Sequence, residues 1–185
     1  AGYTGYQTGD SFIDSNFKKN IEGALDAGLD VGVYFFSQAI TVEEAMREAK
    51  MTLDAIKNYK ITYPVVFDWE VIYDDEARTD GMSVNMLTNV TIAFCETIKA
   101  AGYTPMVYAN RKHAYLKLDL TKLKNYDFWL AEYNDTTAYR YNYQMWQYSC
   151  TGQIDGIEGD VDLNISFVDY GKRYRKAHGE DEVIG

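Results

Sequence analysis

The chain has 185 residues and a formal net charge of −10, and this length is enough for one domain with a sizeable hydrophobic core. The acidic balance argues against a nucleic-acid-binding protein, because phosphates would repel it. No run approaches about 18 consecutive apolar residues and no charged-then-apolar signal segment opens the chain, so we expect no membrane span.

Two predicted helices in the first 70 residues carry clear end signals. Asp14 is the expected N-cap of the first helix, and Gly28 is its expected stop. Thr41 and Glu44 form a capping box at the start of the second helix. In chain order this region therefore predicts a helix over residues 15–27, a buried strand over 31–37, a helix over 41–58 and a buried strand over 64–70.

The next part of the chain begins with an acidic segment that we interpret as a solvated loop containing Asp74, Asp75 and Glu76. A long helix follows and is expected to stop at Gly102. Short strands with little helix between them complete the pattern. In chain order we expect a loop over residues 71–81, a helix over 83–101 and strands over 104–109, 126–133, 143–149 and 160–164.

Repeated strand–helix–strand units predict an α/β fold with parallel strands and right-handed crossovers. The first half fits either a doubly wound sheet or a (βα)8-type (TIM-like) barrel. No Gly-rich phosphate loop follows a strand, which argues against dinucleotide binding. In a barrel, chemistry lies at the carboxyl ends of the strands. The barrel is favoured because these residues fall at such ends: Asp68, Glu70, Tyr108, Ala109, Glu132, Tyr133, residues 146–148 and Asp162.

The segment PVVFDWE, residues 64–70, is an apolar strand that ends in two carboxylates. Asp68 and Glu70 are two residues apart, so in a strand they point to the same face, roughly 6.6 Å apart along the backbone. Two like charges at the end of a buried strand are costly, which indicates a functional site more than a solvated loop. The pair predicts general acid–base chemistry, and glycoside hydrolysis is the commonest reaction run by two carboxylates. Trp69 alternates away and is expected to pack beneath the helices.

Few residues of this chain could hold a metal ion. Its two histidines, His113 and His178, and the absence of a CxxC motif make a zinc site improbable. Cys95 falls on the apolar face of a predicted helix and is expected to be buried. The sequence does not decide whether Cys95 and Cys150 form a disulfide. We expect neither a metal nor an organic cofactor.

Further candidate residues have two interpretations each. Asp162 lies in the alternating run DVDLN, which lacks the glycine and distal glutamate of a calcium-binding EF-hand loop. Asp155 and Asp160 are expected in turns beside glycines. The 17 Tyr, 8 Phe and 3 Trp are unusual, because aromatic rings at strand ends could either pack in the core or stack on sugars. This choice stays open for Tyr34, Tyr108, Trp129 and Trp146.

Five stretches of the chain, in order, resemble glycoside hydrolase family 25, the Chalaropsis-type lysozymes (N-acetylmuramidases). The resemblance covers roughly residues 1–170. DWE after an apolar strand is specific for this family when it is followed by WLAEY and by WQYS…G…VDLN further along the chain. The stretches are AGYTGYQTGDSFIDSNFKKNIEGALDAGLDVGVYFFS, PVVFDWE, AAGYTPMVYAN, FWLAEYN and MWQYSCTGQIDGIEGDVDLN.

The resemblance implies a short, irregular (βα)8 barrel that cleaves the β-1,4 bond between N-acetylmuramic acid and N-acetylglucosamine. By position, Glu70 would be the general acid, with a raised pKa, and Asp68 would be a supporting carboxylate that stays ionised. Asp162 would be the second supporting carboxylate. The spacing leaves a retaining or an inverting outcome open. The implied substrate-binding residues are Tyr34, Tyr108, Trp129, Glu132, Trp146 and Asn164.

One departure from the family pattern concerns the start of the chain. The family begins with a strand of the type G-[IV]-D-[VI]-S, whose Asp also lies in the active site, whereas this chain starts at AGY. With six predicted strands, we expect the first one to two strands of the barrel to be missing. We interpret residues 1–170 as an N-terminally incomplete catalytic domain and residues 171–185 as a charged tail, which is a terminal helix or a frayed linker rather than a basic binding patch.

Two rival functions are a non-catalytic sugar-binding barrel and a chitinase-like glycosidase. The chitinase-like enzymes carry a longer acidic motif, DxxDxDxE, that PVVFDWE lacks. A pure binder has no need of the three acids. The resemblance implies peptidoglycan glycan strands as the partner, with neither nucleic acid nor membrane, and a location that is extracellular or phage-encoded and directed to the cell wall. Open barrel edges could also allow self-association.

Overall fold

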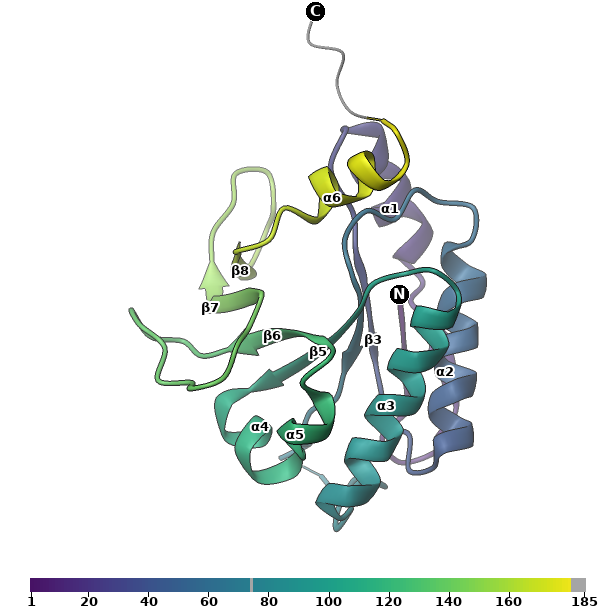
Figure 1. The fold of residues 1–185 in the computed structure, drawn as a ribbon, viewed down its shortest axis with the longest axis vertical. Helices are drawn as coiled ribbons and strands as arrows, with labels where there is room; N and C mark the ends of the chain where they lie inside the picture. Colours follow the sequence, from purple (N-terminus) through teal and green to yellow (C-terminus); the bar gives the residue numbers. More distant parts are fainter. Residues whose placement is uncertain (74, 181–185) are drawn as a thin grey trace, which may run out of the picture.

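The computed structural model describes residues 1–73 and 75–180, so Asp74 of the predicted loop and residues 181–185 of the predicted tail lie outside it. Its centre is an open eight-stranded sheet (Figure 1). In spatial order the strands are β2 (Ser11–Ile13), β1 (Gly2–Thr4), β3 (Val33–Phe36), β4 (Val65–Asp68), β5 (Pro105–Asn110), β6 (Asp127–Ala131), β7 (Met145–Gly152) and β8 (Val161–Ser166).

The sheet is mostly parallel. Strands β1 and β3 to β7 run in one direction, and the two edge strands β2 and β8 run antiparallel to their neighbours. The α/β class is therefore confirmed, and the sheet is an irregular, barrel-like one that does not close between its edges β2 and β8. All carboxyl ends of the parallel strands meet at one edge, which is where a site is expected.

The helices begin and end close to the predicted positions. Thr41 caps α2 by accepting a hydrogen bond from the Glu44 amide, and Ser83 caps α3 through the Met86 amide. Helices α2 and α3 lie side by side against the sheet (Figure 1). None of the helices in the described ranges is both long and apolar enough to span a bilayer. The helices are α1 (Phe17–Asp26), α2 (Val42–Ile56), α3 (Val84–Ala100), α4 (Arg111–Lys117), α5 (Leu120–Leu123) and α6 (Tyr170–Ala177).

Strand alternation divides the core into two clusters. On β4, Val65 and Phe67 face the helices and join the large cluster, which also contains Phe94 of α3. Val66 faces the opposite side and joins a small inner cluster with Met106. Because side chains alternate along a strand, Asp68 faces the same inner side as Val66, two residues before it. Trp69 joins the helix-side cluster, as predicted.

Some predicted details of the fold are wrong. The sheet has two strands more than the six expected, since β1 and β2 form a hairpin at the start of the chain. Asp14 is not the N-cap of α1. That position belongs to Asn16, and Asp14 Oδ1 instead accepts a hydrogen bond from the Asn16 amide at 2.8 Å. Both cysteines are free thiols, with Cys95 buried as expected and Cys150 exposed.

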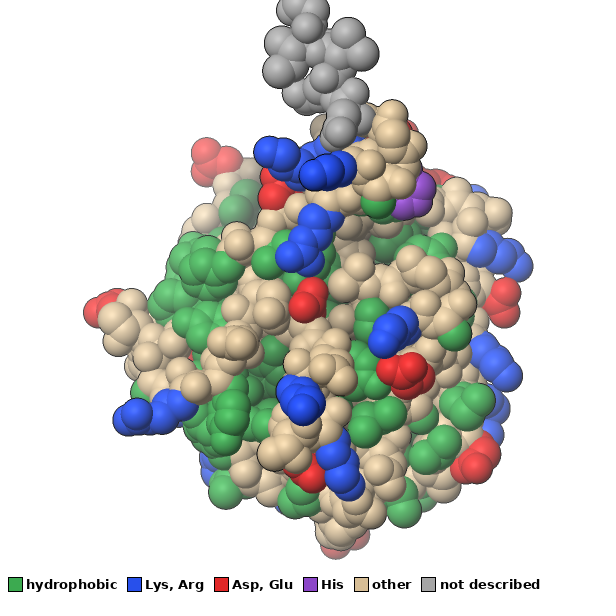
Figure 2. Space-filling model, viewed as in Figure 1, with side chains coloured by type: hydrophobic (Ala, Val, Ile, Leu, Met, Phe, Trp, Pro, Cys, Tyr) green, Lys and Arg blue, Asp and Glu red, His purple; other side chains and the backbone are tan. Residues whose placement is uncertain are grey.

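The described part of the charged tail is mainly helical. Helix α6 begins at the buried Tyr170 and packs beside the start of β3, where Arg175 pairs with Asp30 at 2.9 Å. Lys and Arg side chains gather over this helix on the surface (Figure 2). The terminal-helix interpretation therefore holds for residues 170–177, whereas the domain boundary at residue 170 stays a prediction.

Candidate active site

A cavity of about 300 Å³ opens on the inner side of the sheet, where the parallel strands end. The strand order brings together acids that lie far apart in sequence, because Asp68 and Glu70 follow β4 and Asp162 lies on β8. The lining residues are Ala1, Gly2, Tyr3, Asp14, Tyr34, Phe36, Asp68, Glu70, Tyr108, Trp129, Gln147 and Asp162.

The wall of this cavity is acidic. Four carboxylates line it, from Asp14, Asp68, Glu70 and Asp162, while no lysine, arginine or histidine does so among the described residues. In the same ranges, no group of three or more His, Cys, Asp or Glu side chains is placed to hold a metal ion. The arrangement therefore suits proton transfer and the stabilisation of positive charge.

Asp68 is the most deeply buried of the predicted catalytic acids, with 8% of its surface exposed. Its Oδ1 atom is buried and has no hydrogen-bond partner. Burial, followed by the nearby Glu70 charge, raises the pKa of Asp68 well above its usual range. The direction of this shift runs against the expectation that Asp68 stays ionised, because burial penalises the charged carboxylate and the nearby Glu70 repels it.

Glu70 lies two residues further along and is partly buried. Burial, and then the charge of Asp162, raises the pKa of Glu70. Asp162 itself is exposed on β8 and lines the same cavity. A raised pKa of Glu70 is what the sequence predicts for a proton donor. The second cause of the shift is the negative charge of Asp162 on β8.

We expect Asp68→Asn to raise stability at about pH 7 by about 1 kcal/mol. The folded-state pKa of Asp68 is raised, so the native state holds its proton more tightly than the unfolded state does. The stabilising contribution of the protonated carboxyl is thus present below the ordinary pKa of about 4 and is lost as pH rises through the folded pKa. Thermal unfolding at about pH 7 and about pH 3.5 checks this. The exposed Asp26→Asn should change neither value, and an equal gain for Asp68→Asn at both pH values would contradict the argument.

Three of the predicted aromatic residues line the cavity, namely Tyr34, Tyr108 and Trp129. Tyr34 is 52% exposed, so its ring is available to a ligand, whereas Tyr108 is buried with its ring edge on Trp129 at 5.0 Å between centroids. Asn164 does not line the cavity, but its Oδ1 accepts a hydrogen bond from Trp129 Nε1 at 2.8 Å. Asn164 therefore orients Trp129.

Gln147 was missed by the sequence analysis, and so was the place of Asp14 at the cavity. Gln147 is buried, and its Oε1 accepts hydrogen bonds from the hydroxyls of Tyr108 at 3.0 Å and Tyr133 at 2.8 Å. One amide thus fixes two phenols, of which Tyr108 lines the cavity. The polar residue inside the aromatic run MWQYS marks Gln147 as unusual, but the local sequence does not show which way its side chain points.

Trp146 and Glu132 are not at the cavity, in contrast to the prediction. Trp146 pairs with Leu130 in the sheet and faces the helix-side cluster, where its Nε1 donates to the Glu132 carbonyl at 2.8 Å. The Glu132 side chain forms an ion pair with Arg111 at 2.7 Å and accepts a hydrogen bond from the Ala138 amide at 3.1 Å. These contacts hold the loop after β6, so both residues serve the structure around the site.

We expect Glu132→Ala to lower the free energy of unfolding by about 1–3 kcal/mol. The carboxylate is 6% exposed, and its removal leaves the Ala138 amide and the Arg111 guanidinium without their partner. Urea denaturation of the variant and of the exposed control Glu158→Ala measures the difference. A loss no larger than that of the control would show that the ion pair is not structural.

Known proteins with similar sequences and structures include glycoside hydrolases and cell-wall lytic enzymes. The sequence model of the glycosyl hydrolases family 25 matches residues 6–157. The autolytic lysozyme of Clostridium acetobutylicum is 27% identical over 155 residues, which are 83% of this chain and 44% of that protein. The crystal structure of the CTP1L endolysin superposes with a TM-score of 0.71 at 26% identity, covering 98% of this chain and 60% of that one.

A second similar structure is that of the modular autolysin LytC from Streptococcus pneumoniae in complex with a synthetic peptidoglycan ligand. It has a TM-score of 0.70 at 26% identity and covers 88% of this chain and 38% of that one. The chain spans about half the length of the curated relatives it matches. Since the family match covers most of the sequence, the chain belongs to the glycosyl hydrolases of family 25.

Proposed function

We propose that this chain carries a muramidase site, which hydrolyses the β-1,4 bond between N-acetylmuramic acid and N-acetylglucosamine in bacterial peptidoglycan. The observation that carries the proposal is the placement of Asp68, Glu70 and Asp162 around one cavity with aromatic walls. Support comes from the lysozyme and autolysin relatives, and from the peptidoglycan ligand bound by the LytC protein.

Glu70 is the general acid in this proposal. Its raised pKa keeps a proton on the carboxyl group, and Glu70 donates that proton to the glycosidic oxygen as the bond to the anomeric carbon breaks. Positive charge then develops on the sugar ring, and the carboxylate of Asp162 stabilises it across the cavity. The acidic wall therefore acts on the transition state more than on the uncharged ground state.

Asp68 has a separate role, which follows from its unpartnered Oδ1. An acetamido N–H of the substrate is a suitable donor for that atom. A hydrogen bond to the ionised carboxyl favours ionisation, so binding of such a group would lower the pKa of Asp68. Asp68 would then orient the substrate's acetamido group, whose carbonyl oxygen attacks the anomeric carbon as the bond to the leaving oxygen breaks. Water then attacks the same carbon, which releases the acetamido oxygen, and the proton of that water passes to the Glu70 carboxylate. A 2-acetamido sugar is therefore a better substrate than a sugar with a free hydroxyl at that position.

The exposed ring of Tyr34 and the oriented ring of Trp129 would hold the sugar faces. We propose that the protein acts at the bacterial wall, either secreted or phage-encoded, since its relatives include an autolytic lysozyme and an endolysin. Self-association stays a prediction. The edge strand β8 is the longer of the two free edges and carries the exposed Ile165.

The test is the identity of the new reducing ends after purified chain is incubated with bacterial peptidoglycan. Borohydride reduction and hydrolysis should give reduced muramic acid. Reduced glucosamine instead would assign the other glycosidic bond. If no reducing ends form while the chain still sediments with the wall, it is a sugar-binding protein and the enzymatic proposal is wrong. Chitin oligosaccharides as the preferred substrate would favour the chitinase-like rival.

A further inference from the structure

The general acid lies beyond the end of its strand. The ladder between β3 and β4 ends with the hydrogen bond from the Ser37 amide to the Asp68 carbonyl, at 2.7 Å. The main chain at Glu70 therefore needs another support if its side chain is to keep one position. That support is the side chain of Gln38, whose Nε2 donates to the Glu70 carbonyl at 3.3 Å.

Gln38 is well suited to hold this position because it is itself fixed. It is fully buried, with 0% exposure. Its Oε1 accepts a hydrogen bond from the Thr79 hydroxyl at 2.9 Å. A flipped amide would turn its oxygen toward the Glu70 carbonyl oxygen, so the donor is directed at Glu70 and the acceptor at Thr79. The amide thus ties the two ends of the loop between β4 and α3 together.

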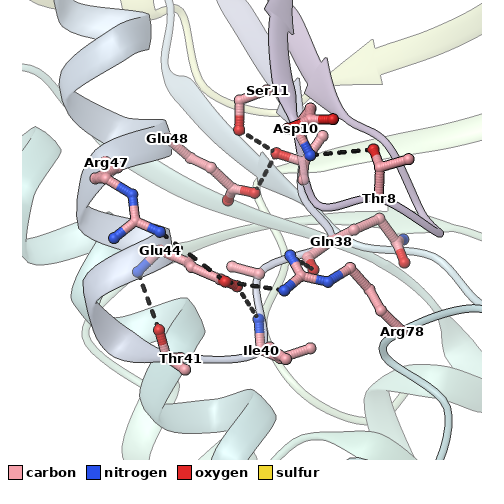
Figure 3. A network of polar contacts seen from close by, with 12 residues as sticks. Thr8, Asp10, Ser11, Gln38, Ile40, Thr41, Glu44, Arg47, Glu48 and Arg78 are labelled. Atoms are coloured by element: carbon pink, nitrogen blue, oxygen red, sulfur yellow. Dashed lines mark hydrogen bonds and ion pairs between the residues drawn. The ribbon is translucent and has the colours of Figure 1, made fainter.

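A second layer of contacts holds Gln38 and the loop from behind (Figure 3). Arg78 reaches the Gln38 carbonyl with Nη1 at 3.4 Å and pairs with Glu44 of α2 through Nη2 at 2.9 Å. Glu44 also accepts a hydrogen bond from the Ile40 amide at 2.8 Å. Gly9 of the β1–β2 hairpin leaves room for the guanidinium, because an added Cβ would lie 2.4 Å from Arg78 Nη1.

We propose that Gln38 is a positioning residue for the general acid and that it acts through the main chain of Glu70. The inference rests on the proposed function, but its structural part, the attachment of the loop to the buried Gln38 amide, can be measured without any substrate. Displacement of a catalytic group by about 1 Å can cost 10²-fold in rate. Loss of the amide should therefore lower kcat far more than it changes KM.

The test uses two variants of similar size. Gln38→Met keeps the length but cannot form hydrogen bonds, so kcat should fall about tenfold to 100-fold with KM within about twofold of the wild type. In Gln38→Glu, a protonated carboxyl can still donate to the Glu70 carbonyl and accept from Thr79. Its activity relative to the wild type should recover as pH falls, and it should drop when the carboxylate forms and repels the Glu70 carbonyl oxygen.

The control is Gln7→Met. Gln7 lies in the β1–β2 turn, and its side-chain amide contacts the same loop by donating to Asp75 at 2.8 Å. This variant should leave kcat unchanged. A purely structural role for Gln38 predicts lower melting temperatures with no pH-dependent recovery in Gln38→Glu. That outcome, or wild-type kcat in Gln38→Met, would overturn the inference.

Amide hydrogen exchange separates this inference from the proposed function. Amide exchange at residues 70–73 and 75–79 should become faster in Gln38→Met. In Gln7→Met it should stay unchanged except near Asp75, the residue that Gln7 contacts. If the wild-type chain cleaves no peptidoglycan, the proposed function is wrong, yet the exchange experiment still decides whether Gln38 holds the loop. Unchanged exchange in Gln38→Met would rule it out.

Discussion

Glu70→Gln is expected to lower the rate of peptidoglycan cleavage about 10³-fold while the fold persists. Glutamine has nearly the same shape, but it has no acidic proton for the glycosidic oxygen. The raised pKa of Glu70 also sets a pH dependence for the wild type, whose activity should fall as pH rises through that pKa and the proton is lost. Reducing-end release across a pH series measures both effects.

The matched control for this experiment is Glu76→Gln, an exposed residue of the loop that follows Glu70. It should retain the wild-type rate and the wild-type pH profile. Circular dichroism and the melting temperature establish that Glu70→Gln is folded. Unchanged turnover in a folded Glu70→Gln protein would remove Glu70 from its role as the acid.

The largest stability effect is expected for Phe94→Ala, at about 3–5 kcal/mol. Phe94 is completely buried on α3, and its ring packs on Phe67 of β4 with 5.4 Å between centroids. The substitution removes this contact and leaves a cavity between the helix layer and the strand that carries the acids. Since domains are stable by only about 5–15 kcal/mol, the variant should lose a large share of its stability.

Urea denaturation measures the loss, and Phe12→Ala is the control with the same chemistry. Phe12 lies on the edge strand β2 and is 47% exposed, so its truncation should cost less than about 1 kcal/mol. Similar losses in the two variants would mean that the Phe67–Phe94 contact does not anchor β4 to α3.

The main architecture was predictable from the sequence because its signals are local. Capping residues such as Thr41 and Ser83 mark helix starts, and the apolar run before Asp68 marks a central strand. The β1–β2 hairpin was missed because each strand has three residues, too few to show alternation. The two strands approach closely at Gly2, where an added Cβ would lie 2.3 Å from the Phe12 carbonyl oxygen.

The site was predictable only in part, for a related reason. The acid pair could be found because Phe67 and Trp69, which flank Asp68, fix the phase of β4. On β7 both phases contain large side chains, so local sequence could not show that Gln147 rather than Trp146 faces the cavity. The pairing of Trp146 with Leu130 of β6 decides it, and that is a long-range contact.

The alternation along β4 has a consequence for how such a protein can evolve. Positions 65, 67 and 69 face the helices and contribute to folding, whereas positions 68 and 70 face the inner side and line the cavity, with Val66 packed in the small inner cluster below them. The side chains of the two sets lie on opposite faces of the sheet and pack in different clusters. Changes of specificity can therefore accumulate on one set while the other keeps the domain folded, and substitutions on the two faces should combine almost independently.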